Sequence, residues 1–321
     1  MDSCTGHRLF MPPKKISIVT PCFAEEGNVR ELAGAVRDVM RTLPMYEYEH
    51  VFIDNGSMDQ TPALLRALAA QDSRIKVILN ARNFGQVRSG YYAMLQTTGD
   101  AVIAMACDFQ DPPALIPHFV KAWESGAKIV LGVKETAAES KLFYGLRSWY
   151  YRLLARIADV QVVKHATGFG LYDRSVVEDL RRIDDPYPFF RGLLAEIGHT
   201  PVTVPYHQPL RARGVTSQNF WSLYDVALLG IVHHSKAPLR LATVTGFFIA
   251  FLSVLAGFGY LVYKLLFWNQ FSVGVAPLVI GMFFLSSVQL VFIGVLGEYL
   301  GAVWTHVRKH PHVFERERLN F

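Results

Sequence analysis

The sequence predicts an α/β protein with a parallel, doubly wound sheet, followed by two helices long enough to cross a membrane. Two observations support this prediction. Strand-like and helix-like segments alternate with short connections over residues 16–132, which is typical of a parallel sheet with helices on both faces. Farther along, residues 241–263 and 275–297 are two runs of 23 residues without a charged side chain.

Hydrophobic periodicity and turn residues give the elements of the α/β part in order. Strands are expected over residues 16–20, 50–53, 75–79, from 101, and over 128–132. Helices are expected over residues 28–41, from 61, over 86–96 and 113–124. Asn28, with Glu31 three residues on, is expected to cap the first helix, and Thr61 to cap the second before Pro62. Residues 167–170 (TGFG) are interpreted as a tight turn.

Polar loops follow four of the expected strands directly, over residues 21–27, 54–57, 80–85 and 108–113. Because parallel strands point the same way, these loops are expected at one edge of the sheet, where open α/β sheets bind ligands. The glycine fingerprint of dinucleotide folds and the Walker A loop are both missing from the sequence. A metal and basic side chains would therefore hold the phosphates of a bound nucleotide.

The stretch AVIAMACDFQDPP, residues 101–113, is the centre of the predicted site. Asp108, Gln110 and Asp111 follow its buried strand, and closely spaced oxygen ligands suit a hard cation such as Mg²⁺. A strand end that turns into a proline-started helix, with Asp as a cap, is the alternative on this stretch alone.

Each of the two apolar runs would be roughly 35 Å long as a helix, enough to cross a hydrocarbon core of about 30 Å. Basic residues flank the pair on its outer sides, and the connection between the runs has one Lys: the flanking residues are Lys236, Arg240, Arg308, Lys309, Arg316 and Arg318. The positive-inside rule then places both flanks and the N-terminal part in the cytoplasm. Residues 219–234 fit either a membrane-interface helix or an ordinary packed helix.

Composition limits the classes of function. The net charge of +5 is too small to indicate nucleic acid binding, and the three cysteines have neither disulfide-framework nor zinc-site spacing. The N-terminus has no apolar core of signal-peptide length, so we expect the catalytic part to stay in the cytoplasm.

Six groups of residues form a recognisable series along the chain: Thr20-Pro21 with Glu25-Glu26, Ile53-Asp54-Asn55-Gly56-Ser57, Arg82-Asn83-Phe84-Gly85, Asp108-Phe109-Gln110-Asp111-Pro112-Pro113, Phe189-Phe190-Arg191-Gly192 and Leu296-Gly297-Glu298-Tyr299-Leu300-Gly301. In the order and spacing of these motifs the chain resembles family 2 glycosyltransferases that act on polyprenyl phosphates. The resemblance extends from residue 16 through both spans.

The resemblance implies a GT-A-type, Rossmann-like nucleotide-sugar-binding domain and a two-helix transmembrane hairpin in the inner membrane, with both termini cytoplasmic. The implied divisions are residues 1–15 as a tail, 16–210 as the glycosyltransferase domain, 211–238 as juxtamembrane helices, 239–304 as the hairpin and 305–321 as a cytoplasmic C-terminal tail. The implied partners are a nucleotide sugar, a polyprenyl phosphate and the membrane. The spans are rich in Gly and Ser and could pack against a second copy of the chain, and no nucleic acid partner is expected.

The resemblance also implies residue roles. Donor-binding residues would be Pro21 and Glu25 at the base and ribose, Asp54 and Asn55 at the nucleoside, and Arg82 close by. Asp108 and Gln110 would hold Mg²⁺ or Mn²⁺ on the diphosphate, and Asp111 would orient the acceptor or be structural. Arg147 and Arg152 would receive the lipid phosphate, and Arg191 would help close the site. A solvated or membrane-facing basic face is the alternative for the helix that contains Arg152.

Three positions depart from the usual family pattern. Ala106 stands at the first position of the Asp-x-Asp metal motif, Asn55 at the second of Asp-Asp-Gly-Ser, and Ala24 where Asn is usual. The loss of a carboxylate at position 106 leaves open a catalytically silent membrane scaffold. A processive polysaccharide synthase is a further alternative, although neither its acceptor motif nor its additional spans are visible.

Overall fold

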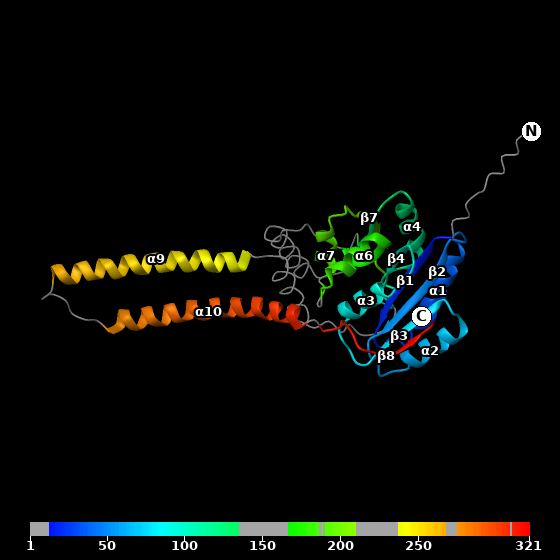
Figure 1. Cartoon of the computed structure of the whole chain (residues 1–321), viewed down its shortest axis with the longest axis horizontal. Coiled ribbons are helices and arrows are strands. Elements are labelled where there is room, and N and C mark those ends of the chain that lie inside the picture. The colour runs from blue at the N-terminus through cyan, green and yellow to red at the C-terminus, as the bar shows by residue number, and fades with distance from the viewer. Residues whose placement is uncertain are drawn as a thin grey trace, which may run out of the picture. The chain divides into compact units, whose positions relative to one another are not determined.

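The computed structural model describes residues 13–134, 166–185, 188, 190–209, 237–267, 275–308 and 310–321. The chain divides into two compact units. The first combines residues 1–147, 161–219 and 310–321, and the second combines residues 148–160 and 220–309. The four predicted site loops therefore lie in one unit and the two predicted spans in the other (Figure 1).

Within the described residues, eight strands form one sheet in the order β7-β5-β6-β4-β1-β2-β3-β8. The strands are β1 (Lys15–Cys22), β2 (Glu47–Asp54), β3 (Ile75–Asn80), β4 (Ala101–Ala104), β5 (Ile129–Lys134), β6 (Ala166–Asp173), β7 (Val202–Tyr206) and β8 (Glu315–Leu319). β1 pairs in parallel with β2 and β4, and β2 pairs in parallel with β3. The five strands expected from the sequence all form.

The five expected strands run parallel to one another, as predicted, but the sheet as a whole is mixed. β6 lies antiparallel between β4 and β5, and β8 lies antiparallel beside β3. Residues 167–170, interpreted as a tight turn, lie inside β6. Close packing explains a glycine there, because a Cβ atom at Gly170 would lie 2.2 Å from the carbonyl oxygen of Val130 on β5.

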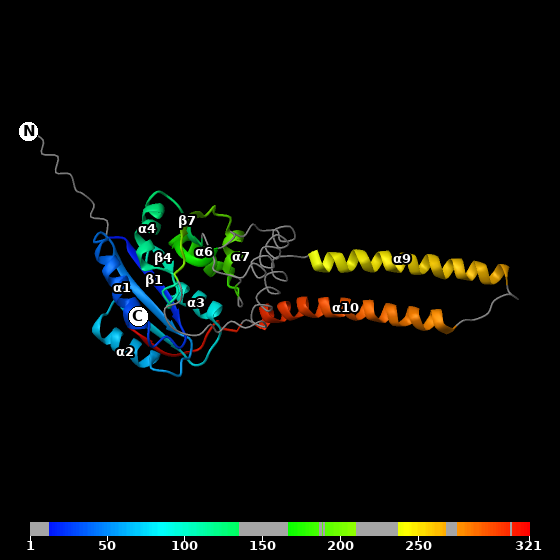
Figure 2. The same ribbon diagram turned by 180° about the vertical axis from the view of Figure 1, so that it is seen from behind.

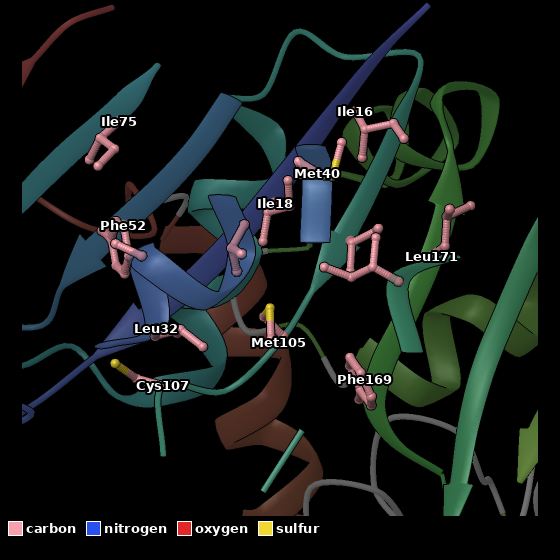
Figure 3. Packing of buried hydrophobic residues seen from close by; sticks show 14 of the residues in the cluster. Ile16, Ile18, Leu32, Met40, Phe52, Ile75, Met105, Cys107, Phe169 and Leu171 are labelled. Atoms are coloured by element: carbon pink, nitrogen blue, oxygen red, sulfur yellow. The ribbon is translucent and has the colours of Figure 1, made fainter. Parts of the chain in front are cut away.

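Helices cover both faces of the sheet, as predicted (Figure 2). On β2, Phe52 belongs to one buried cluster while Val51 and Ile53 belong to the other, which is the period of two expected for a strand. Figure 3 shows Ile18, Leu32 and Phe52 within the first cluster. The helices are α1 (Val29–Arg41), α2 (Thr61–Gln71) and α4 (Ile116–Glu124, after the 3₁₀ turn Pro113–Leu115) on the first face, and α3 (Gln86–Leu95), α6 (Arg174–Ile183) and α7 (Phe190–Ile197) on the second.

Asn28 occupies the predicted N-cap position of α1 without making a side-chain cap hydrogen bond, and the prediction of Thr61 as a cap is wrong. Asn28 has a helical backbone, and its amide nitrogen donates to Glu25 Oε2 at 2.5 Å. Thr61 is the first residue of α2, and its hydroxyl accepts a hydrogen bond from the Glu25 backbone N–H at 3.0 Å. Both side chains therefore hold the loop that follows β1.

The segment interpreted as a C-terminal tail contributes an edge strand. α10 extends to Arg308, and β8 then pairs with β3 through residues 77–80 (Figure 1). Arg66 of α2 donates from Nε and Nη2 to Glu317 Oε2, at 2.9 and 2.7 Å. The alternating charges of this strand (ERERL) gave no hydrophobic signal, because its charged side chains form bonds at the sheet edge while Leu319 packs against the core.

The second unit contains α9 (Ala237–Leu266) and α10 (Val275–Arg308), which lie side by side (Figures 1 and 2). Their segments Leu241–Tyr260 and Gly281–Thr305 have mean hydropathies of 2.1 and 1.7, and none of either window is buried. Thr243, Ser287 and Thr305 donate their hydroxyl protons to carbonyls four residues back in the same helix. Length, composition and this internal bonding make both helices candidate membrane spans.

Candidate active site

The loops after β1, β2 and β3 meet at one edge of the sheet, as predicted. The Ala24 N–H donates to Ser57 Oγ at 2.9 Å, which joins the first two loops. Asn55 Nδ2 donates to Asn83 Oδ1 at 2.8 Å, which joins the second and third. Because β4 is parallel to β1, the loop that contains Asp108 leaves the sheet at the same edge.

Two of these loops hold a non-glycine residue in the left-handed region. Ala24 has φ of +55° and Phe109 has φ of +60°. Such a conformation costs an L-residue roughly 1 kcal/mol, and strained residues cluster at functional sites. Asn tolerates this conformation better than Ala, which gives a physical reason for the usual family residue at position 24.

Asp54 is fully buried at the end of β2, where it organises its own loop. Its Oδ2 accepts hydrogen bonds from the backbone N–H groups of Gly56 and Ser57, at 3.2 and 3.0 Å, and its Oδ1 accepts one from the Ser57 hydroxyl. Burial raises the pKa of this carboxyl, whereas these hydrogen bonds lower it. Contact of Asp54 with a nucleoside stays a prediction.

Asn55 connects the loops through a buried amide. Its Oδ1 accepts hydrogen bonds from the Phe84 N–H at 2.9 Å and from Ser89 Oγ at 2.8 Å. Together with the Nδ2 bond to Asn83, these contacts fix the loop of residues 80–85. An Asp at position 55 would have no side-chain N–H to donate to Asn83 Oδ1. The departure from the family pattern therefore has a structural use here. Donor contact by Asn55 also stays a prediction.

Gly56 is required where the second and third loops touch. Its φ is +79°, and a Cβ atom there would lie 2.6 Å from the carbonyl carbon of Arg82. The Arg82 side chain is exposed, with its guanidinium 4.1 Å from the ring centroid of Phe84 and a 3.0 Å hydrogen bond to the Asn83 carbonyl. The structure therefore presents a basic side chain at the predicted donor edge.

Residues 106–113 form the loop predicted to bind a metal. Asp108 is 8% exposed, and its Oδ1 accepts a hydrogen bond from the Gln110 N–H at 3.1 Å. Asp111 turns back toward the start of the loop: its Oδ2 accepts from the Ala106 N–H at 2.9 Å, and its Oδ1 accepts from the Tyr206 hydroxyl at 3.2 Å. The two carboxylates thus have different surroundings within one loop.

Burial raises the pKa of Asp111 to about 6. The nearby charge of Asp108 raises it further, while the Ala106 and Tyr206 hydrogen bonds and the charge of Lys134 lower it. A carboxyl that titrates near neutrality is typical of functional sites, but a buried structural carboxyl shows the same shift. Both roles predicted for Asp111 therefore remain open.

The loop of residues 106–113 offers a small number of oxygen atoms that suit a hard cation. The described residues contain no group of three or more His, Cys, Asp or Glu side chains that could hold a metal ion. Asp108 and Gln110 offer only oxygen ligands, and Mg²⁺ is often bound through one or two carboxylates plus substrate phosphates. These residues fit a metal held mainly by a diphosphate.

Two of the predicted arginines lie outside the described residues, namely Arg147 and Arg152. Arg191 is the second residue of α7 and is half-buried. Burial raises the pKa of Tyr172 on β6, the charge of Arg191 lowers it, and the charge of Asp111 raises it further. The charges of Arg191 and Asp111 therefore have opposite effects on this buried hydroxyl.

Tyr206 and Lys134 were missed by sequence reasoning. They are opposite each other at the ends of β7 and β5, and both act on Asp111. β7 is a short edge strand far along the chain, so local sequence gave no indication that it ends beside the Asp108 loop. Gly132 makes room for this arrangement, because a Cβ atom there would lie 2.9 Å from Phe169 and 3.2 Å from Tyr206.

Comparison with known proteins defines the class. Residues 17–181, just over half of the chain, match the family described as Glycosyl transferase family 2. The chain therefore belongs to glycosyl transferase family 2 and is a glycosyltransferase, and the predicted family and α/β fold class are confirmed.

Particular relatives are similar over almost the whole chain. The SfII prophage-derived bactoprenol glucosyl transferase of Shigella flexneri is 35% identical over 92% of this chain and 96% of its own length. The prophage bactoprenol glucosyl transferase homolog of Escherichia coli (strain K12) is 33% identical over 92% of this chain and 97% of its own length. Among solved structures, glucosyl-3-phosphoglycerate synthase from Mycobacterium tuberculosis has a TM-score of 0.44 at 17% identity, covering 68% of this chain and 78% of that one.

Proposed function

We propose that this glycosyltransferase moves one sugar from a UDP-sugar donor to the phosphate of a polyprenyl phosphate. The main support is that one chain combines the family 2 domain, whose strand-end loops meet at one edge, with two candidate membrane spans. Relatives named bactoprenol glucosyl transferases align with 92% of the chain, so the similarity includes both parts.

The donor would lie across the edge formed by the first three loops. Pro21 and Glu25 would line the base and ribose site, and Asp54 and Asn55 would hold the loop beneath them. Arg82 is the exposed cation there, and guanidinium groups bind phosphate oxygens well. The loops already bond to one another, so the site is pre-organised for the donor.

The diphosphate leaving group would lie at the Asp108 loop. Asp108 and Gln110 would hold Mg²⁺ or Mn²⁺, which supplies Lewis-acid stabilisation of a departing diphosphate when bound. Asp111 would keep the loop closed through Ala106 and Tyr206. Its buried carboxylate would also orient the acceptor next to the donor sugar.

The acceptor needs little base catalysis. A phosphate monoester has a second pKa of about 6, so its oxygen is already an anionic nucleophile near neutral pH. Arg147 and Arg152 would hold this phosphate in line with the bond between the sugar and the diphosphate, and Arg191 would help close the site. One in-line displacement would form the new sugar–phosphate bond, release the nucleoside diphosphate and invert the anomeric centre.

We place the catalytic unit and both chain ends on the cytoplasmic face of the inner membrane. β8 returns to the sheet that the N-terminal residues build, so the chain leaves and re-enters one unit through α9 and α10. This return fits a hairpin with both ends on one side. The basic residues on its outer flanks favour the cytoplasmic side.

Ala106 supports the competing function, a membrane scaffold that binds nucleotide sugar without transfer. The test is to incubate membranes that contain the protein with radiolabelled UDP-sugars and polyprenyl phosphate, and to measure label in the lipid fraction. We expect lipid-linked sugar from the wild type and at least roughly a hundredfold less from Asp108→Ala, since lost leaving-group stabilisation is worth several kcal/mol.

Asp38→Ala is the matched control, because Asp38 is an exposed carboxylate on α1. It should transfer sugar at the wild-type rate. Absence of lipid-linked label with every donor would favour the scaffold, and full activity in Asp108→Ala would remove Asp108 from the mechanism.

A further inference from the structure

The C-terminal segment of residues 310–321 docks on the first unit through polar contacts. Arg66 pairs with Glu317, and Arg318 Nη2 donates to Gln96 Oε1 of the segment after α3 at 3.0 Å. Asn320 Nδ2 donates to the carbonyls of Ala69 and Ile75, both at 2.8 Å. These contacts fix β8 along the outer edge of β3.

The part of the segment before β8 contacts the predicted donor loop itself. The Ala81 N–H donates to the Phe314 carbonyl at 2.8 Å, just beyond an irregularity in the β3–β8 pairing between Leu79 and Asn80. Arg88 Nη2, in the first turn of α3, donates to the Pro311 carbonyl at 2.9 Å. The Phe314 ring lies 6.1 Å from the ring of Phe84, centroid to centroid.

The loop of residues 80–85 is therefore held from two sides. From within the sheet edge, Asn55 bonds to the Phe84 N–H and to Asn83. From outside, Phe314 bonds to Ala81 and packs on Phe84, whose ring also lies under the Arg82 guanidinium. The Phe314 ring stays 56% exposed, so burial in the core does not explain an aromatic residue at this position.

We infer that Phe314 is a positioning residue for the donor site: it holds the loop that presents Arg82, through the Phe84 ring and the Ala81 N–H. The inference rests on the proposed function, since it assumes that the 80–85 loop binds the nucleotide donor. A loop fixed before binding loses less conformational entropy when the donor arrives. The apolar helix α10 ends at Arg308, so Phe314 follows the end of this helix after a few residues of sequence.

The test compares three variants of the full-length, detergent-purified protein. Phe314→Ala should raise KM for the UDP-sugar and Kd for UDP by about tenfold, with kcat within about twofold, because the loop must then be ordered on binding. Phe314→Tyr keeps the ring and should behave as wild type. Glu317→Gln is the matched control. Glu317 lies on β8, close to Phe314 in the sequence, and this change removes its ion pair with Arg66 of α2, which is not part of the loop of residues 80–85.

Hydrogen–deuterium exchange of residues 80–85 is measured in parallel and needs no activity. We expect faster exchange in Phe314→Ala alone. Unchanged exchange and KM in Phe314→Ala, or an equal rise of KM in Glu317→Gln, would overturn the inference. A wild-type protein that neither binds UDP nor transfers sugar would refute the proposed function, and the exchange measurement would then decide whether Phe314 holds the loop.

Discussion

At the residue scale, the two carboxylates of the Asp108 loop have different surroundings. Asp108 is the carboxylate predicted to face the metal, whereas Asp111 is held by Ala106 and Tyr206 inside the protein. Because its pKa is about 6 in the fold and 3.8 is its usual value, ionisation of Asp111 works against folding. This difference gives a pH-dependent prediction.

Replacement of Asp111 by Asn should stabilise the protein above pH 6 by up to about 3 kcal/mol. Below pH 3.8 the carboxyl is protonated in both folded and unfolded chains, so the gain should vanish there. Between these values the unfolded chain loses the proton first, and wild-type stability falls as pH rises. Thermal unfolding of the detergent-purified protein at several pH values measures this, with Asp38→Asn as an exposed control. A gain that does not depend on pH would contradict the assignment.

The alanine at position 106 gives the second prediction at this scale. Ala106→Asp restores the first carboxylate of the family metal motif and adds an oxygen ligand. The Mg²⁺ concentration that gives half-maximal transfer should fall by about tenfold, which corresponds to about 1.4 kcal/mol of binding. Ala106→Asn has the same size without the charge and should change this concentration less. An unchanged Mg²⁺ requirement in Ala106→Asp would place the metal away from this residue.

At the element scale, local sequence patterns predicted the strands and helices whose formation depends on neighbouring residues. The alternation of apolar strands and amphipathic helices located the first five strands, and the polar residues after them located the site edge. The position of β6 between β4 and β5 depends on contacts between distant segments, so its glycine-rich sequence was interpreted as a turn. For the same reason the sequence did not predict β7, which contains Tyr206, or β8, which directly follows the residues that contact the loop of residues 80–85.

The packing of β6 against β5 can be tested at Gly170. A Cβ atom there would lie 2.2 Å from the Val130 carbonyl oxygen, so the strands must separate. Gly170→Ala should destabilise the protein by roughly 2–4 kcal/mol in thermal unfolding. The matched change Gly34→Ala, in α1 with no atom within 4 Å of the added Cβ, should instead stabilise by up to about 1 kcal/mol. Equal effects of the two changes would argue against the close β5–β6 approach.

At the scale of the whole molecule, the chain leaves its catalytic unit for two apolar helices and then returns to the same sheet. The sequence predicted the two helices from length and composition, with spans at 241–263 and 275–297, and the candidate spans in the structure are Leu241–Tyr260 and Gly281–Thr305. The return through β8 could not be predicted, because its charged residues resemble a solvated tail. This return makes the proposed donor site and the two candidate membrane spans parts of one continuous chain that begins and ends in the same unit.

The central claim is the transfer of a single sugar to a polyprenyl phosphate. Its most direct test is mass spectrometry of the lipid product that the purified protein makes from a UDP-sugar and polyprenyl phosphate. We predict a product with one sugar on each lipid phosphate, whose mass does not grow with reaction time. A ladder of longer products would indicate a processive synthase, and a nucleotide-sugar-binding protein that gives no glycosylated lipid with any donor would contradict the account.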